Sequence, residues 1–162
     1  MLISDNHSLV YEVYSKELYR HLYFLTGNKE LSEDLLQNTF IRVFQKLDQL
    51  KDSHKLRSWI YQIARNLYFD HLKSGYESTK DILDDDVPSL DSSSKAQAES
   101  VHDLNFILNQ LSPDDREIIL LVEMEGMTVS EVSDITRDSS AAIKSRLLRA
   151  RKKIISIKNE SF

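Results

Sequence analysis

The chain has 162 residues, of which 41% are apolar and 29% are charged, and its formal net charge is −5. This composition is typical of a globular protein with one domain or two small ones, and the lack of cysteine excludes disulfide bonds, thiolate metal sites and cysteine nucleophiles. Three glycines and two prolines are too few for a loop-rich β-fold, so the sequence favours helices. No apolar run approaches the roughly 18 residues of a membrane span, and the N-terminus lacks the pattern of a secretory signal. We therefore expect a cytoplasmic protein without membrane insertion.

Apolar residues at helical spacing predict three helices in the first half of the chain. The first helix ends at Gly27 and Asn28, the second runs from about residue 32 to 47, and the third from about 57 to 73. Their apolar faces comprise Val10, Tyr14, Leu18, Leu22 and Leu25 in the first, Leu36, Phe40, Val43 and Leu47 in the second, and Trp59, Ile60, Ile63 and Leu67 in the third.

Charge is unevenly distributed along the chain. Residues 55–75 carry a net charge of +3, residues 76–100 carry −5, and residues 137–158 carry +7. The stretch 84–94 has too little apolar content to offset the entropy of ordering it, and its like charges keep it extended. We therefore predict an all-α protein of two small helical domains, residues 5–75 and 97–158, joined by a flexible acidic linker over residues 76–96.

Helix-capping residues mark the elements of the second domain. Ser112, followed by proline, begins a helix that is predicted to run to Gly126, because serine caps helix N-termini and proline suits the first helical position. Thr128 and Glu131 form a capping box for a short helix. A last helix begins at residue 139 or 140 and carries Ile143, Leu147, Ala150, Ile154 and Ile157 on one face.

The last two helices are separated by about four residues, which is the spacing of a helix-turn-helix. The second of them begins with small residues that let a helix end approach base edges, and it continues with cations that can reach phosphates or guanines. The candidate contacts to duplex DNA are Ser139, Ser140, Ala142, Lys144, Ser145, Arg146 and Arg149. A solvated basic helix beside a helical core is the alternative interpretation.

The third predicted helix mixes cations with aromatic rings, the combination that binds single-stranded DNA. The candidate contacts are His54, Lys55, Arg57, Trp59, Tyr61, Arg65, Asn66 and Phe69. Asn66 offers both a donor and an acceptor to a base edge. Trp59 also lies on the apolar face of the helix, where packing in the core is its alternative role.

Short motifs lie in order along the chain at residues 33–40 (EDLLQNTF), 57–72 (RSWIYQIARNLYFDHL), 116–121 (REIILL), 125–128 (EGMT), 131–132 (EV), 143–147 (IKSRL) and 149–151 (RAR). Together they resemble the extracytoplasmic-function (ECF) sigma factors of bacterial RNA polymerase. These motifs occur in the order and spacing of that family and cover nearly the whole chain. The family commonly has glycine in the helix-turn-helix turn, where this chain has Arg137 and Asp138, so we expect a positive φ at Arg137.

The resemblance implies an alternative sigma factor, a promoter-specificity subunit that binds core RNA polymerase and melts promoter DNA without catalytic residues of its own. It implies contact with the clamp helices and the flap of the polymerase, capture of the opened minus-ten strand by residues 51–73, and reading of the minus-thirty-five duplex by the last helix. It also implies control by an anti-sigma factor. The residues that it places against the clamp helices are Asp34, Gln37, Asn38 and Arg42; the family usually has an acid at the position of Asn38.

The residues alone leave other functions open. A repressor or activator that uses only the helix-turn-helix would bind duplex DNA tightly without polymerase, a helical-bundle enzyme would hold a metal or cofactor, and a helical adaptor would bind only protein. The five histidines are scattered and no phosphate-binding or nucleophile motif occurs, so we expect no metal, cofactor or catalytic site. The acidic linker either competes with DNA for the basic faces or runs through a basic channel of polymerase.

Overall fold

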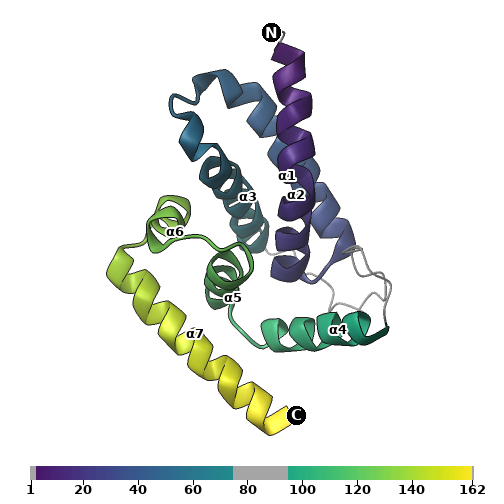
Figure 1. Cartoon of the computed structure of the whole chain (residues 1–162), viewed down its shortest axis with the longest axis vertical. Helices are drawn as coiled ribbons and strands as arrows, with labels where there is room; N and C mark the ends of the chain where they lie inside the picture. The colour runs from purple at the N-terminus through teal and green to yellow at the C-terminus, as the bar shows by residue number, and fades with distance from the viewer. Residues whose placement is uncertain (1–2, 75–94, 162) are drawn as a thin grey trace.

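The computed structural model describes residues 3–74 and 95–161, and every regular element in these two ranges is helical (Figure 1). The first range forms α1 (Ile3–Thr26), α2 (Lys29–Lys46) and α3 (Leu56–Lys73), with short 3-10 turns η1 (Leu47–Gln49) and η2 (Ser53–Lys55) before α3. The second forms α4 (Lys95–Asn109), α5 (Pro113–Ile119), η3 (Leu120–Met124), α6 (Val129–Thr136) and α7 (Ser140–Ser161). The prediction of an all-α fold is confirmed.

The predicted linker and the structure differ at one boundary. Residues 75–94, most of the predicted linker, lie outside the described residues. Lys95 and Ala96, which the sequence placed in the linker, form the start of α4. None of the described helices is long and apolar enough to span a membrane.

α2 begins earlier than the sequence predicted, because Asn28 caps it. The Asn28 side chain accepts a hydrogen bond from the backbone N–H of Leu31 at 3.0 Å, which satisfies a donor at the helix start. Ser32, the predicted first residue, is instead fully buried, and its hydroxyl lies 2.7 Å from that of Thr26. These contacts fix the short connection between α1 and α2.

The predicted caps of the second half are confirmed. The Ser112 side chain accepts from the backbone N–H of Asp115 at the start of α5. Thr128 and Glu131 make both hydrogen bonds of a capping box at the start of α6. Arg137 ends α6 with a φ of 64°, the positive φ that the sequence predicted.

The single helix predicted from Ser112 to Gly126 changes part-way from α-helical to π-helical hydrogen bonding. The α-helical part, α5, ends at Ile119 and is followed by η3, which is π-helical. The backbone N–H of Glu125 donates to the carbonyl oxygen of Leu120 at 3.0 Å, five residues back. A π-helical turn accommodates one extra residue. The turn therefore rotates the residues that follow it about the helix axis and changes which of their side chains face the core.

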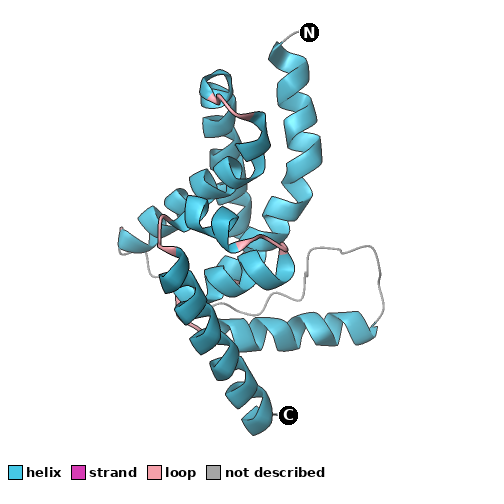
Figure 2. Cartoon of the chain, turned by 60° about the vertical axis from the view of Figure 1, so that its left-hand side comes forward, coloured by secondary structure: helices cyan, strands magenta, loops and turns pink. Residues whose placement is uncertain are grey.

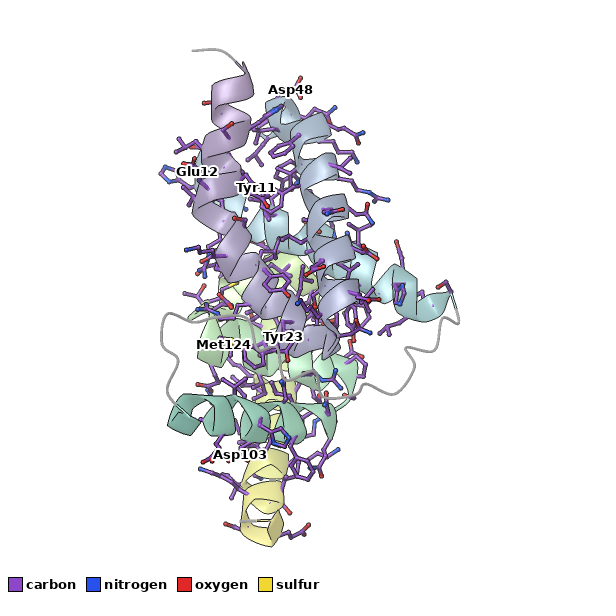
Figure 3. All side chains as sticks on the ribbon, turned by 90° about the vertical axis from the view of Figure 1, so that its right-hand side faces the viewer. Tyr11, Glu12, Tyr23, Asp48, Asp103 and Met124 are labelled. Atoms are coloured by element: carbon purple, nitrogen blue, oxygen red, sulfur yellow. The ribbon has the colours of Figure 1, made fainter. Side chains whose placement is uncertain are left out.

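A continuous apolar core joins the two halves of the molecule. α1, α2 and α3 pack together, α5 packs on α7, and α3 packs on α6 across the two halves (Figure 1). α4 lies across the end of α1, and α7 runs past it to the C-terminus (Figure 2). Tyr23, on the part of α1 above α4 (Figure 3), accepts from Asn105 Nδ2 of α4 at 3.4 Å. The two halves are therefore in direct contact as well as joined through the chain.

Candidate nucleic-acid interface

The two arginines of α3 lie on the face that meets α1 and the second half of the chain. Arg57 Nε donates to Glu17 Oε1 of α1 at 3.0 Å, and Arg57 Nη2 donates to the backbone carbonyl of Glu125 at 3.0 Å. Two turns further along α3, Arg65 Nε donates to Glu117 Oε1 at 3.0 Å. The guanidinium of Arg65 also lies over the ring of Phe69, 4.5 Å from its centroid.

Glu125 is a buried carboxylate that several donors of the first half surround. Its side chain has no exposed surface. Glu125 Oε2 accepts from Arg20 Nη2 and from the hydroxyl of Tyr61, both at 3.2 Å, and Arg57 Nη2 lies 3.5 Å away. Burial raises the pKa of the Glu125 carboxyl and the positive charge of Arg20 opposes this rise. Burial also raises the pKa of the Tyr61 hydroxyl, which therefore stays protonated and donates.

Glu117 forms a second buried ion pair with α3. Burial raises the pKa of the Glu117 carboxyl to about 7, although Arg65 lowers it. Glu117 Oε2 is buried and has no hydrogen-bond partner among the described residues. The Arg65 pair therefore compensates only part of the cost of burying this carboxylate.

The predicted contacts to single-stranded DNA fall into three groups of exposure. His54, Lys55 and Asn66 are exposed; Arg57, Trp59, Arg65 and Phe69 are half-buried; Tyr61 is buried. In this arrangement Tyr61 is bonded to Glu125 and is not accessible to a base. Trp59 packs against the core, which agrees with its alternative role. Its ring also lines a pocket of about 440 Å³ between the loop before α3 and α6.

α2 presents the predicted polymerase-docking residues on its outer surface. Asp34, Gln37, Asn38 and Arg42 are all exposed, while Leu35, Thr39 and Val43 are buried against the rest of the bundle. Ile41 is 53% exposed and shares this outer face by its helical spacing. Ile41 was not among the predicted contacts, although its helical spacing from Gln37 and Asn38 places it on the same face. We call the set Asp34, Gln37, Asn38, Ile41 and Arg42 the α2 face.

α7 packs its apolar face into the core and exposes its basic face to solvent. Ile143, Leu147 and Ala150 are buried, so the helix is fixed in rotation. The predicted duplex contacts Ser139, Ser140, Lys144, Ser145 and Arg149 are exposed, and Ala142 and Arg146 are half-buried. The Ser139 hydroxyl accepts from the backbone N–H of Ala142 at 3.1 Å, so Ser139 caps the helix. Arg146 Nη1 donates to Asp138 Oδ2 at 3.0 Å, which ties the start of α7 to the turn.

Within residues 3–74 and 95–161, no group of three or more histidine, aspartate or glutamate side chains is arranged to hold a metal ion. The buried carboxylates Glu117 and Glu125 are instead paired with arginines. Their chemistry is that of binding and charge pairing.

Comparison with known proteins decides the family. The sigma-70 region 2 family matches residues 10–76, and the sigma-70 region 4 family matches residues 103–154. The ECF RNA polymerase sigma factor SigM of Bacillus subtilis is 32% identical over 154 residues, which cover 93% of each chain. The chain belongs to the ECF family of RNA polymerase sigma factors. It is an alternative sigma factor.

A further ECF sigma factor is similar to the chain in sequence, and two solved structures are similar to it in fold. SigX of Bacillus subtilis is 25% identical over 153 residues, which cover 88% of this chain and 78% of SigX. The sigma factor RpoE of Bartonella quintana, solved with the anti-sigma factor NepR, matches with a TM-score of 0.78 and 23% identity over 97% of this chain and 99% of that one. CnrH, solved with the cytosolic domain of CnrY, matches with a TM-score of 0.76 and 18% identity over 98% and 91%. This ECF sigma factor therefore has the fold of those structures.

Proposed function

We propose that this sigma factor directs core RNA polymerase to promoters through the α2 face, the α3 surface and the basic face of α7. The observation that carries the proposal is α7, in which buried Ile143 and Leu147 hold exposed Lys144 and Arg149 toward solvent. A helix fixed in this way can place its N-terminal residues in the major groove and its cations on phosphates. We assign the minus-thirty-five duplex to this surface.

The α3 surface is suited to the opened minus-ten strand. Asn66 is exposed beside the half-buried ring of Phe69 and the guanidinium of Arg65. Stacking of bases on rings and pairing of cations with phosphates are the contacts that hold single strands, and they must offset a few kcal/mol per unstacked base. His54 and Lys55, exposed in the loop before α3, would meet the same strand.

The α2 face is suited to a protein partner. It combines carboxylate, amide, guanidinium and one exposed isoleucine on a rigid helix, the mixture typical of a specific interface with a polar rim. We assign it to the clamp helices of the polymerase. We assign the flap of the polymerase to the second half of the chain. Once one half has bound the polymerase, the other half is held nearby, which raises the effective concentration for the second binding event.

Control by a second protein is part of the proposal. RpoE and CnrH, which share this fold, were solved with NepR and with the cytosolic domain of CnrY, and we propose an anti-sigma factor for this chain as well. The regions 10–76 and 103–154 would act as two functional domains. The sigma factor itself would have no catalytic residues and would act where the polymerase is, in the cytoplasm.

Co-elution with core RNA polymerase tests the docking step. Ile41→Glu places a charge on the α2 face and should weaken binding to core polymerase at least tenfold. Leu9→Glu is the matched control, because Leu9 is also a largely exposed apolar residue, at 58%, and lies on α1; it should leave binding unchanged. A wild-type chain that does not co-elute with core polymerase would overturn the proposed function.

A further inference from the structure

The turn before α7 carries an aspartate that is paired with an arginine of α7. Arg146 Nη1 donates to Asp138 Oδ2 at 3.0 Å. Resting on the proposed function of α7, we propose that Asp138 is a positioning residue, which holds the guanidinium of Arg146 in the orientation that reads a guanine of the minus-thirty-five duplex. The choice of promoter then depends on a residue that acts through its neighbour and does not itself touch DNA.

The backbone of Asp138 is held by two hydroxyl groups of α6. Its N–H donates to Thr136 Oγ1 at 3.3 Å, and its carbonyl oxygen accepts from the hydroxyl of Ser133 at 2.7 Å. Thr136 is buried, and its own hydroxyl donates to the carbonyl oxygen of Val132 at 3.0 Å. Because both backbone groups of Asp138 are bonded to α6, its carboxylate projects from a fixed point of the helix-turn-helix.

The residue before Asp138 fixes the path of the turn. Arg137 has a φ of 64°, and its N–H donates to the carbonyl oxygen of Ser133 at 2.8 Å. With the amide oxygen of Gln62 turned toward it, Arg137 donates from Nη2 at 2.9 Å and from Nε at 3.0 Å. The left-handed backbone at Arg137 turns the chain from α6 toward α7 (Figure 1) and places Asp138 between the two helices.

The side chain of Arg146 runs toward the start of α7. Side chains of an α-helix lean toward its N-terminus, and the hydrogen bond to Asp138, eight residues earlier in the chain, requires this direction. Ala142 lies one turn before Arg146 on the same side of the helix, and its small side chain leaves room for the longer one. The guanidinium therefore lies at the N-terminal end of α7, and this is the end of a recognition helix that meets base edges.

The pair with Asp138 leaves donors of the guanidinium for DNA. A guanidinium has five N–H donors in a planar fork, and Asp138 accepts from Nη1. Nε and Nη2 share the other edge, and two such parallel donors match the O6 and N7 acceptors of guanine. Arg146 can therefore read a guanine while it stays paired, so DNA does not have to displace the aspartate.

Partial burial makes this pair more restrictive than an exposed ion pair. The side chains of Arg146 and Asp138 are 24% and 33% exposed, whereas those of Arg151 and Glu123, a pair between α7 and η3, are 49% and 50% exposed. Exposed pairs hold their side chains weakly. An arginine that moved freely on α7 would meet phosphates, which carry no sequence information, whereas a fixed guanidinium binds a base edge at a lower cost in side-chain entropy.

Competition between Asp138 and DNA for Arg146 is the opposite role, and a different measurement reveals it. A carboxylate that masked Arg146 would weaken binding to all sequences alike, because it would withhold a positive charge from the phosphates. A carboxylate that positions Arg146 strengthens the preference for one base pair. The preference for a base, measured apart from the overall affinity, therefore separates the two roles.

Selection of duplex DNA by the holoenzyme measures this preference at each position. Core polymerase with the full chain is mixed with a pool of duplexes of random sequence, the bound duplexes are sequenced, and core polymerase alone gives the background. The test variant is Asp138→Ala. Glu123→Ala is the matched control, because Glu123 is also an acid outside α7 that pairs with an arginine of α7.

The wild type should prefer guanine at one position of the minus-thirty-five duplex, and Asp138→Ala should reduce this preference at least fivefold without changing those at other positions. Glu123→Ala should change none of them. Arg146→Ala should lose the same preference, and adding Asp138→Ala to it should have no further effect, because Asp138 acts through Arg146. Unchanged preferences in Asp138→Ala, or tighter binding of all sequences alike, would overturn the proposal.

Two further comparisons keep the result specific. Asp138→Asn serves if Asp138→Ala does not fold; its neutral oxygen pairs more weakly than a carboxylate and should reduce the preference at least twofold. A duplex motif selected by the wild type supports the proposed function whatever the variants do, and unchanged preferences in the variants then overturn this inference alone. A wild-type holoenzyme that selects no motif overturns the proposed function of α7 and this inference with it.

Discussion

The imidazole of His21 meets the ring of Tyr61 edge-on, with ring centroids 5.0 Å apart. His21 lies in the core of the first half, and its Nδ1 has no hydrogen-bond partner among the described residues. Burial lowers the pKa of His21 to about 3, and the charges of Arg20 and Arg57 add to this effect. His21 is therefore neutral beside Tyr61 throughout the physiological range of pH.

This neutral histidine should make the fold sensitive to acid. In the unfolded chain His21 takes up a proton near its ordinary pKa of 6.5, whereas in the folded chain it does so only near 3. The free energy of unfolding should therefore fall as the pH drops from 6.5 toward 3. Glu117 acts in the opposite sense between about 7 and 4.5, because its folded pKa is raised and protonation stabilises the folded state there.

The two effects can be separated by urea unfolding at pH 7.5 and pH 5.0. Between pH 7.5 and pH 5.0 the stability of Glu117→Gln should decrease more than that of the wild type, because Glu125, whose pKa burial also raises, is present in both. In Glu117→Gln with His21→Gln the decrease should be much smaller. The same decrease in both variants would show that His21 is not the group that titrates.

Arg137 and Gln62 should be coupled energetically. Replacing a non-glycine residue at positive φ by glycine relieves about 1 kcal/mol of strain, but Arg137→Gly also removes the bonds to Gln62. In a Gln62→Ala background, Arg137→Gly should therefore stabilise the fold by about 1 kcal/mol. In the wild-type background, Arg137→Gly should change the free energy of unfolding less favourably, by at least about 0.5 kcal/mol. A double-mutant cycle by urea unfolding measures the coupling, and additivity of the two substitutions would refute it.

The capping box of α6 should contribute measurable stability. Thr128→Ala removes the hydroxyl that accepts from the backbone N–H of Glu131 at 3.1 Å, and loss of an N-cap costs about 1 kcal/mol. Ser130→Ala is the control, since Ser130 is an exposed serine on the same helix. Urea unfolding should show a loss for Thr128→Ala alone; equal losses would mean that the cap has no special role.

Lys144 should contribute a phosphate contact. It is exposed on α7, and loss of one phosphate contact reduces the slope of log K against log salt by about 1. Holoenzyme with Lys144→Ala should show this reduction on duplex promoter DNA, measured by anisotropy at several salt concentrations. Lys16→Ala, at an exposed position of α1, is the control, and an unchanged slope in Lys144→Ala would place Lys144 away from the DNA.

Features that depend on neighbouring residues were predictable from the sequence. The caps at Ser112 and Thr128 follow from contacts within a few residues, and the structure has both. The positive φ of Arg137, which the structure also has, was expected from the glycine that the family has at this turn. The buried face of α2 was only partly predicted. Leu35 and Thr39 are buried and Leu36 is half-buried, because packing against α1 and α3 sets the rotation of that helix.

The contacts of the α3 arginines with Glu117 and Glu125 were not predicted, because they join residues far apart in the sequence. Arg65 and Glu117 are separated by 52 positions, and no local pattern pairs them. One signal was present: Glu117 directly precedes the apolar run from Ile118 to Leu121, which forms part of the core. The π-helical turn that directs Glu125 inward depends on tertiary packing, which propensity alone does not supply.

Transcription in vitro by core RNA polymerase, on a library of promoter fragments with and without the chain, tests most directly whether this sigma factor specifies promoters. With the chain, transcripts should start at a shared set of sites that core polymerase alone does not use, and Asn66→Ala and Lys144→Ala should reduce them while Lys16→Ala does not. The absence of initiation at any defined site in the presence of the wild-type chain would contradict the proposed function.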